Sequence, residues 1–225
     1  MPVWLVVDYE NTRRVGHRMF GATGAPFHTT VIHPRFLAAQ IIAARATDGA
    51  GRPPVKIIGI DVHVGLPSAR REPFPNAVSQ AQHARWTTVS GIPVQVFARP
   101  LVYTQHEKLS ADDFVVGEKG VDLAAAIRAI ELTQASHAPV RGVILASEDT
   151  DFRPLVDYLV RCGNTLIETC SWQGAGLASP DCEWNTVLGR QHFEQSLDRF
   201  DYAAEIRRKR QGRGTPSRTH VFRNV

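Results

Sequence analysis

The sequence predicts an α/β protein in which a mainly parallel sheet lies between two layers of helices. Five short runs of apolar, largely β-branched residues recur along the chain, and segments with apolar residues at helical spacing separate them. Runs that are apolar on both faces are typical of parallel strands buried between helices. The alternation of strands and helices therefore favours a three-layer α/β/α sandwich with Rossmann-like topology.

The five expected strands are defined by these runs. The first strand is expected over Val3–Val7, where the apolar run stops at Asp8. The other four are expected over Lys56–Val64, Ile92–Phe97, Val140–Ala146 and Thr165–Glu168.

Helices are expected between and after the strands. They are placed over Phe36–Arg45 behind Pro34, over Asn76–Trp86, over Lys119–Thr133, over Phe152–Val160 and, as a final amphipathic helix, over residues 190–206. Lys119–Thr133 has the clearest helical periodicity and Asn76–Trp86 the weakest. Gly65–Pro75 is expected to be a surface loop, and Tyr103–Val116 an irregular segment long enough to be functional.

The charge of the chain is divided unevenly. The 225 residues carry a formal charge of +4, yet residues 207–225 contain seven basic residues and no acidic one. Residues 1–206 therefore have a net charge of −3. The whole chain has 43% hydrophobic and 21% charged residues, so residues 1–206 can form one folded domain, its last portion (170–206) being a helical extension. The basic remainder is expected to be disordered.

Several classes of protein are excluded by simple counts. No apolar run reaches the roughly 18 residues that suggest a membrane span, and the first residues do not resemble a secretory signal. Three cysteines without C-x-x-C spacing support neither a disulfide framework nor a zinc knuckle. A cytoplasmic location is the expectation that follows.

Acidic residues gather where strands of the expected sheet end. Asp8 and Glu10 follow the first strand, and Glu148, Asp149 and Asp151 follow the fourth. In an open parallel sheet, ligands bind at the carboxyl ends of the strands. Clustered carboxylates repel one another unless a counter-charge is present, and hard cations such as Mg²⁺ or Mn²⁺ prefer oxygen ligands. An ordinary role as helix caps remains open for each of these acids.

A third group of acidic residues lies at the start of the expected helix with the clearest periodicity, Lys119–Thr133. Glu118 and Asp122 are four residues apart, so they share a helix face if the helix begins early enough.

Three short blocks of this sequence resemble, in order and spacing, the signature blocks of NYN domains in the PIN-like nuclease superfamily. They are Asp8–Asn11 (DYEN), Glu118–Asp122 (EKGVD) and Ser147–Phe152 (SEDTDF), and the Arg99–Leu101 turn matches as well. The likeness covers residues 3–169. It implies a PIN-like fold whose acidic pocket binds Mg²⁺ or Mn²⁺ and, in active members, hydrolyses RNA.

The resemblance also implies roles for individual residues. The metal ligands, which are catalytic residues too, would be Asp8, Asp122, Asp149 and Asp151. Asn11 would position a metal-bound water or a phosphate, Ser147 would orient the last block, and Lys119 would touch the RNA backbone. Glu148 stands where the family often has glycine. It would face solvent, add a ligand or crowd the pocket.

An acidic pocket repels phosphate, so basic residues must border it if RNA binds there. The residues expected to contact RNA are Arg13, Arg14, Arg99, Lys119 and Ser147, with Arg18, Arg70, Arg71 and Arg85 as further basic candidates. His17, Tyr103 and His106 are candidates for stacking on unpaired bases. The basic tail is expected to bind the RNA backbone without reading its sequence.

The function expected from these features is a metal-dependent (endo)ribonuclease that leaves 5′-phosphate and 3′-hydroxyl ends. No histidine lies in the three blocks, which argues against cleavage through the 2′-hydroxyl. RNA is the expected partner, no membrane contact is expected, and a homodimer stays open. Two alternatives remain: a non-catalytic RNA-binding or scaffold module of the same fold, and a phosphatase or nucleotide hydrolase.

Overall fold

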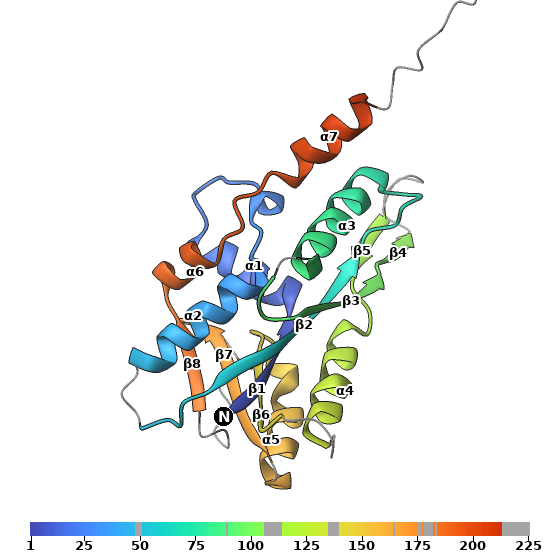
Figure 1. Ribbon diagram of the computed structural model, residues 1–225. Helices are drawn as coiled ribbons and strands as arrows, with labels where there is room; N and C mark the ends of the chain where they lie inside the picture. Colours follow the sequence, from blue (N-terminus) through green and yellow to red (C-terminus); the bar gives the residue numbers. More distant parts are fainter. Residues whose placement is uncertain are drawn as a thin grey trace, which may run out of the picture.

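The computed structural model has a six-stranded, entirely parallel sheet at its centre (Figure 1). It describes residues 1–47, 51–88, 90–105, 114–134, 140–163, 165–174, 177, 182 and 184–212. The strands are β1 (Pro2–Asp8), β2 (Lys56–Leu66), β3 (Val94–Pro100), β6 (Gly142–Ala146), β7 (Leu166–Trp172) and β8 (Trp184–Leu188), in the order β3-β2-β1-β6-β7-β8. The first strand of the chain therefore stands in the middle of the sheet.

Helices cover both faces of this sheet, as the sequence predicts. One face is covered by α1 (Tyr9–Phe20), α2 (Pro34–Thr47), α3 (Pro73–Thr88) and α6 (Arg190–Ser196), the other by α4 (Val121–Gln134) and α5 (Arg153–Cys162). Short 3₁₀ helices occupy Phe27–Thr29 (η1) and Thr150–Phe152 (η2). Each layer has its own hydrophobic core. The three-layer α/β/α sandwich is thus confirmed.

The alternation of side chains along β1 decides which way Asp8 points. Val3, Leu5 and Val7 belong to the core beneath α1 and α2, whereas Val6 belongs to the core beneath α4 and α5. Because successive side chains of a strand face opposite ways, Asp8 lies on the same side as Val6. It therefore faces the α4 and α5 layer.

A buried ion-pair network ties α2 to the edge of the sheet formed by β7 and β8. The Glu168 side chain on β7 is completely buried and accepts a hydrogen bond from Arg45 Nε on α2 at 2.8 Å. Arg52 Nη1 lies 3.5 Å from the same carboxylate, and Thr186 on β8 donates its hydroxyl to it. Buried charges of this kind need all their partners.

Two short strands were not expected. The segment 103–116, predicted to be irregular, contains β4 (Val102–Gln105) and β5 (Phe114–Gly117), which pair antiparallel outside the main sheet. Residues 106–113 between them lie outside the described residues. Val102, Val115 and Val116 are exposed, so these strands lack the buried, alternating face by which a strand is recognised in a sequence. The edge strand β8 was also missed.

The C-terminal region differs from the expected single helix over residues 190–206. The chain leaves α6 at Ser196, and Leu197 forms an isolated bridge with Ile32. A second helix, α7 (Tyr202–Gly212), then begins where the Asp201 side chain accepts the N–H of Ala204 at 2.8 Å. Residues 207–212 of the expected disordered tail are therefore helical, which corrects the boundary at 206. Residues 213–225 lie outside the described part.

None of the described helices has the length and apolar character that crossing a bilayer requires.

Candidate acidic site at the sheet switch point

The strand order places a topological switch point, termed the acidic crevice, at the carboxyl ends of β1 and β6. The strand β1 has β2 on one side and β6 on the other, and the helices that follow β1 and β6, α1 and α5, lie on opposite faces of the sheet. Ligands of open α/β sheets bind at such switch points. Asp8 and the segment Ser147–Asp151, which the sequence singled out, meet there.

One serine hydroxyl joins the two acidic segments. Asp8 is 1% exposed, and its Oδ2 accepts a hydrogen bond of 2.7 Å from Ser147 Oγ. The same hydroxyl accepts the backbone N–H of Asp149 at 3.0 Å. The carboxylate of Asp8 and the backbone of Asp149 are therefore separated by a single hydroxyl group.

The capping alternative holds for one of these acids. Asp149 Oδ1 accepts the N–H of Asp151 at 2.9 Å and so caps η2. Asp8 stands at the N-cap position of α1, yet its side chain makes no capping hydrogen bond. Its carboxylate is turned toward the crevice network instead, so capping does not explain Asp8.

Asn11 and Thr12 anchor α1 to the same loop. Asn11 Oδ1 accepts the backbone N–H of Glu148 at 3.0 Å, and Thr12 Oγ1 donates to the carbonyl oxygen of Ala146 at 3.2 Å. Trp172 Nε1 in turn donates to the carbonyl of Thr12 at 2.8 Å. These bonds fix the start of α1 against the ends of β6 and β7.

The predicted metal ligands lie within electrostatic reach of one another. Burial raises the pKa of Asp8 to about 7; the Ser147 hydrogen bond opposes this effect, and Asp122, Glu118 and Asp149 add to it. Partial desolvation, followed by the charges of Asp149 and Asp151, raises the pKa of Asp122. Carboxylates whose pKa values are raised by burial and by their acidic neighbours are ones that a cation would stabilise in their charged form.

Glu148 points into the protein, which answers one question that the sequence left open. Its Oε1 accepts the backbone N–H of Trp172 at 2.6 Å, and its Oε2 has no hydrogen-bond partner among the described residues. Burial, followed in effect by the charge of Asp8, raises its pKa to about 8. Glu148 therefore lies under the crevice beside β7 and does not extend into solvent.

Glu118 takes a different position from the one expected. The helix α4 begins at Val121, so Glu118 precedes it and shares no helix face with Asp122. Its carboxylate instead accepts the N–H of Gly65 at the end of β2. A Cβ atom at Gly65 would lie 2.6 Å from Glu118 Oε1, so this close approach requires glycine. Asp122, in contrast, stands in the first turn of α4.

Of the residues expected to contact RNA, two are buried or paired within the protein and three are exposed. Arg13 is largely buried: it pairs with Glu10 at 2.8 Å, donates to the carbonyl of Thr30 at 3.1 Å and lies 3.9 Å above the ring of Phe27. Ser147 is completely buried, which leaves it the orienting role and no surface for RNA. Arg14, Arg99 and Lys119 are exposed.

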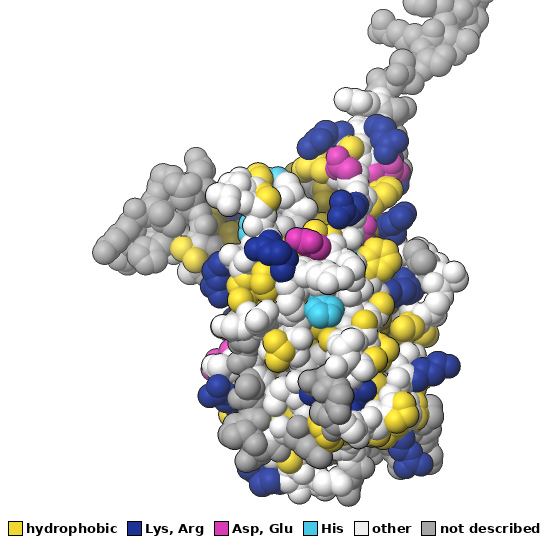
Figure 2. Space-filling model, turned by 90° about the vertical axis from the view of Figure 1, so that its left-hand side faces the viewer, with side chains coloured by type: hydrophobic (Ala, Val, Ile, Leu, Met, Phe, Trp, Pro, Cys, Tyr) yellow, Lys and Arg dark blue, Asp and Glu magenta, His cyan; other side chains and the backbone are white. Residues whose placement is uncertain are grey.

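The further candidates are similarly divided. Arg18 and Arg70 are exposed, Arg71 lies 4.1 Å above Phe114, and Arg85 lies 4.3 Å above Phe200. His17 shares a hydrogen bond with Thr30, and Tyr103 accepts the N–H of Ser68, so both have structural partners. His106 lies outside the described residues. Figure 2 shows Lys and Arg side chains spread over one face with few acidic ones, so positive charge is not confined to the C-terminus.

His63 is a neighbour of the site that no sequence block indicated. It lies opposite Asp8 in the register of β1 and β2 and is 1% exposed. Its ring stacks on Phe97 at 4.9 Å, and neither ring nitrogen has a partner among the described residues. Burial lowers its pKa to about 4, so the ring is neutral at pH 7. Only its position in the parallel pair with β1 reveals it.

Metal ligands were also sought as groups. Within the part of the chain that the structure describes, no three His, Cys, Asp or Glu side chains are arranged so that they could hold a metal ion together.

Comparison with known proteins supports the fold and gives no function. No protein-family model matches the sequence, and no curated protein matches it. Among solved structures, the chain is similar to a crystal structure of a protein of unknown function from Vibrio parahaemolyticus RIMD 2210633, with a TM-score of 0.50 and 14% identity. The match covers 88% of this chain and 96% of that one. The shared property is the fold alone.

Proposed function

We propose that this protein is a metal-dependent ribonuclease of NYN type that hydrolyses RNA phosphodiester bonds to 5′-phosphate and 3′-hydroxyl ends. The observation that supports the proposal best is the chain Asp8–Ser147–Asp149 at the switch point of the sheet. Around it lie Asp122 and Glu118, whose charges raise the pKa of Asp8. A crevice that concentrates negative charge in this way suits a divalent cation and, through it, a phosphate.

The donor set fits Mg²⁺ or Mn²⁺. Mg²⁺ is commonly held by one or two carboxylates, and its other positions are filled by water and substrate phosphate, so a group of three protein ligands is not required. Asp8 and Asp149 would hold it, and Asp122 and Asp151 would complete the surrounding charge. When bound, such an ion supplies charge neutralisation at the phosphoryl oxygens and a more acidic water.

The chain's own residues have separate tasks in this proposal. Ser147 holds the carboxylate of Asp8 by a hydrogen bond that lowers the pKa of Asp8, so it favours the charged form that a cation needs. Asn11 holds the backbone at Glu148 and so keeps the β6 loop in place. Asp151 is exposed, and its carboxylate makes no hydrogen bond to a described residue, so it is free to accept a proton from water.

The proposal is tested by incubating the full chain with end-labelled single-stranded RNA in the presence of Mg²⁺, Mn²⁺ or EDTA. Cleavage is expected with either metal, and Asp149→Asn should lower its rate by about 100-fold or more because it removes one of two ligand charges. Glu194→Gln is the matched control, since it removes one charge from the exposed surface of α6.

The ends of the products decide the chemistry. Products with 5′-phosphate and 3′-hydroxyl ends are expected, because His63, the histidine paired with Asp8 across β1 and β2, is buried and has no access to the 2′-hydroxyl of RNA. A dominant 2′,3′-cyclic phosphate would contradict the proposed reaction. Metal-independent RNA binding without cleavage, unchanged in Asp149→Asn, would favour a binding module of the same fold. Hydrolysis of small phosphate esters alone would favour a phosphatase.

A further inference from the structure

A large cavity opens beside the acidic crevice. Its volume is about 790 Å³, within the range of about 300–1,000 Å³ typical of sites for small organic groups. It lies between the start of α1, the inner face of α3, the end of β2 and the segment 198–203 that leads into α7. Glu10 and Glu118 line it, and the charge of Glu118 also acts on Asp8. Glu118 therefore relates the cavity to the acidic site, although the four aspartates of that site do not line the cavity.

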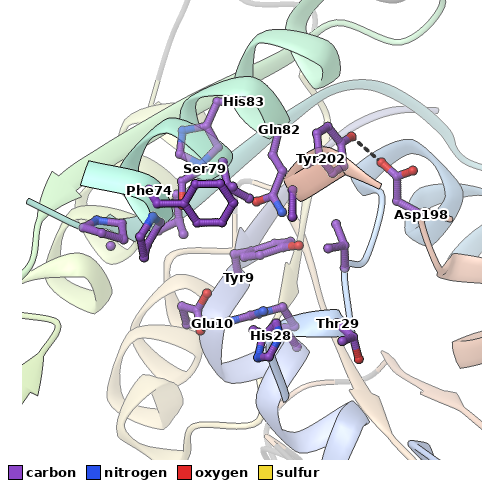
Figure 3. Close-up of a pocket in the computed structure, with 18 of the residues that line it drawn as sticks. Tyr9, Glu10, His28, Thr29, Phe74, Ser79, Gln82, His83, Asp198 and Tyr202 are labelled. Atoms are coloured by element: carbon purple, nitrogen blue, oxygen red, sulfur yellow. Dashed lines mark hydrogen bonds and ion pairs between the residues drawn. The ribbon is translucent and has the colours of Figure 1, made fainter. Parts of the chain in front are cut away.

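Aromatic rings form much of its wall. Tyr9, Phe74, Phe200 and Tyr202 line the cavity, and Figure 3 shows the ring of Tyr9 below Phe74, with Tyr202 closing one side. The Tyr9 hydroxyl is fully used: it donates to the carbonyl of Ile32 and accepts that residue's N–H. Tyr9 is only 4% exposed and its ring packs against Trp86 at 5.0 Å, so it forms part of the cavity floor and leaves little ring surface free. Walls of this kind suit a flat heterocycle.

The face of α3 that borders the cavity is mixed. Beside Phe74 and Val78, the polar residues Ser79, Gln82 and His83 line the cavity, and their side chains make no hydrogen bond to a described residue. Polar residues on this face help to explain why α3 has the weakest apolar periodicity of the predicted helices. Gln82 offers both a donor and an acceptor, which is what the edge of a nucleobase requires.

Basic side chains stand at the rim. Arg14, Arg199 and Arg207 belong to the lining, and all three are exposed. Arg207 lies 5.6 Å and Arg210 5.3 Å above the ring of Phe74, so α7 holds one aromatic wall in place. The weak, exposed contact between Arg14 and Glu10, at 3.4 Å, leaves Arg14 available to a phosphate.

We propose that the cavity binds one unstacked base of a single-stranded RNA. The supporting features are the aromatic walls, the polar side chains of α3, the basic rim and the carboxylates of Glu10 and Glu118 in the lining. The inference rests on the proposed function: the neighbouring phosphate would lie at the acidic crevice while the base enters the cavity. The base stacks against Phe74 above the floor formed by Tyr9, and its edge meets Ser79 and Gln82. The C-terminal segment 198–207 is then part of the substrate site.

The first test measures binding without catalysis. The full chain in EDTA is titrated with short oligoribonucleotides that carry one 2-aminopurine, and fluorescence reports whether the base leaves solution and stacks. Phe74→Ala should weaken binding by about 10-fold or more, the range found when a stacking aromatic is removed. Gln82→Ala should weaken it by about 3- to 10-fold. Gln80→Ala is the matched control, because Gln80 is exposed on the same helix and does not line the cavity.

The second test separates this inference from the proposed function. With Mg²⁺ or Mn²⁺ present, Gln82→Ala should raise KM several-fold and leave kcat nearly unchanged. If both cavity variants bind and cleave like Gln80→Ala, the cavity inference is wrong while the nuclease proposal stands. If the cavity variants lose binding but the unmodified chain never cleaves RNA, base binding stands and the nuclease proposal falls. Unfolding curves of each variant establish that a loss of binding is not a loss of fold.

Discussion

Replacing Ser147 with alanine removes the one hydroxyl that connects Asp8 with the backbone of Asp149. The Asp8 carboxyl is buried and the backbone N–H of Asp149 is partly buried, so the change leaves both groups without this hydrogen bond. Each buried group left without a partner costs about 1–3 kcal/mol. We expect the free energy of unfolding of Ser147→Ala to be lower by about 2–4 kcal/mol.

The change should also alter how stability depends on pH. The pKa of Asp8 is about 7 in the folded protein and 3.8 for an ordinary aspartate, so between these values the folded chain keeps a proton that the unfolded chain has lost. Stability therefore falls as the pH rises through this window. The Ser147 bond lowers the pKa of Asp8, so without it the fall should continue above pH 7.

The measurement is urea unfolding in EDTA at several pH values from 5 to 9, followed by circular dichroism. Ser196→Ala is the control, since Ser196 is equally buried but its hydroxyl only donates to the carbonyl of His192 within α6. That variant should lose about 1 kcal/mol or less, with an unchanged pH profile. If Ser147→Ala loses no more than Ser196→Ala and its profile is also unchanged, the assigned role of Ser147 is refuted.

Three further predictions concern the charges around and beyond the crevice. Glu148→Gln should leave the free energy of unfolding unchanged at pH 4 and raise it by about 2–4 kcal/mol at pH 9 in EDTA. The reason is that the folded protein raises the pKa of Glu148 to about 8, whereas the amide carries no charge to bury. If the variant and the unmodified chain are equally stable at both pH values, the prediction is wrong. Glu168→Gln should lower the free energy of unfolding by about 3–5 kcal/mol, since Arg45 is left buried without its counter-charge, whereas Glu194→Gln should be nearly neutral in the same urea assay. Deleting residues 213–225 should weaken RNA binding and flatten its salt dependence while kcat stays the same, because this segment adds three arginines that can contact phosphates; an unchanged slope of log Kd against log salt would show that they make no such contact.

The strands at the centre of the sheet could be predicted because burial on both faces leaves an unmistakable run of apolar residues. The first strand reads Val3-Trp4-Leu5-Val6-Val7, and four of these five side chains are buried in the cores. The edge strand β8 and the pair β4 and β5 carry polar or exposed side chains, so their sequences resemble loops. These segments are strands because they pair with a neighbouring strand, and that pairing cannot be recognised from their own residues.

Helix α1 was missed for a related reason. Its inward face contains Thr12 and Gly16 where an ordinary amphipathic helix has large apolar residues. A Cβ atom at Gly16 would lie 2.9 Å from Trp172 Nε1 and 3.0 Å from Phe193, so the helix packs there by close approach. The acidic residues of the site could be found because they follow recognisable strands. His63 and the lining of α3 could not, because their positions depend on which elements become neighbours in space.

The central position of β1 has a consequence for how the protein is made. One edge of this first-synthesised strand pairs with β2, but the other must wait for β6, and Asp8 meets Ser147 only across 139 residues. At about 5–20 residues per second, that wait is on the order of ten seconds. During it, the open edge of β1 is a site where a nascent chain can aggregate or recruit a chaperone.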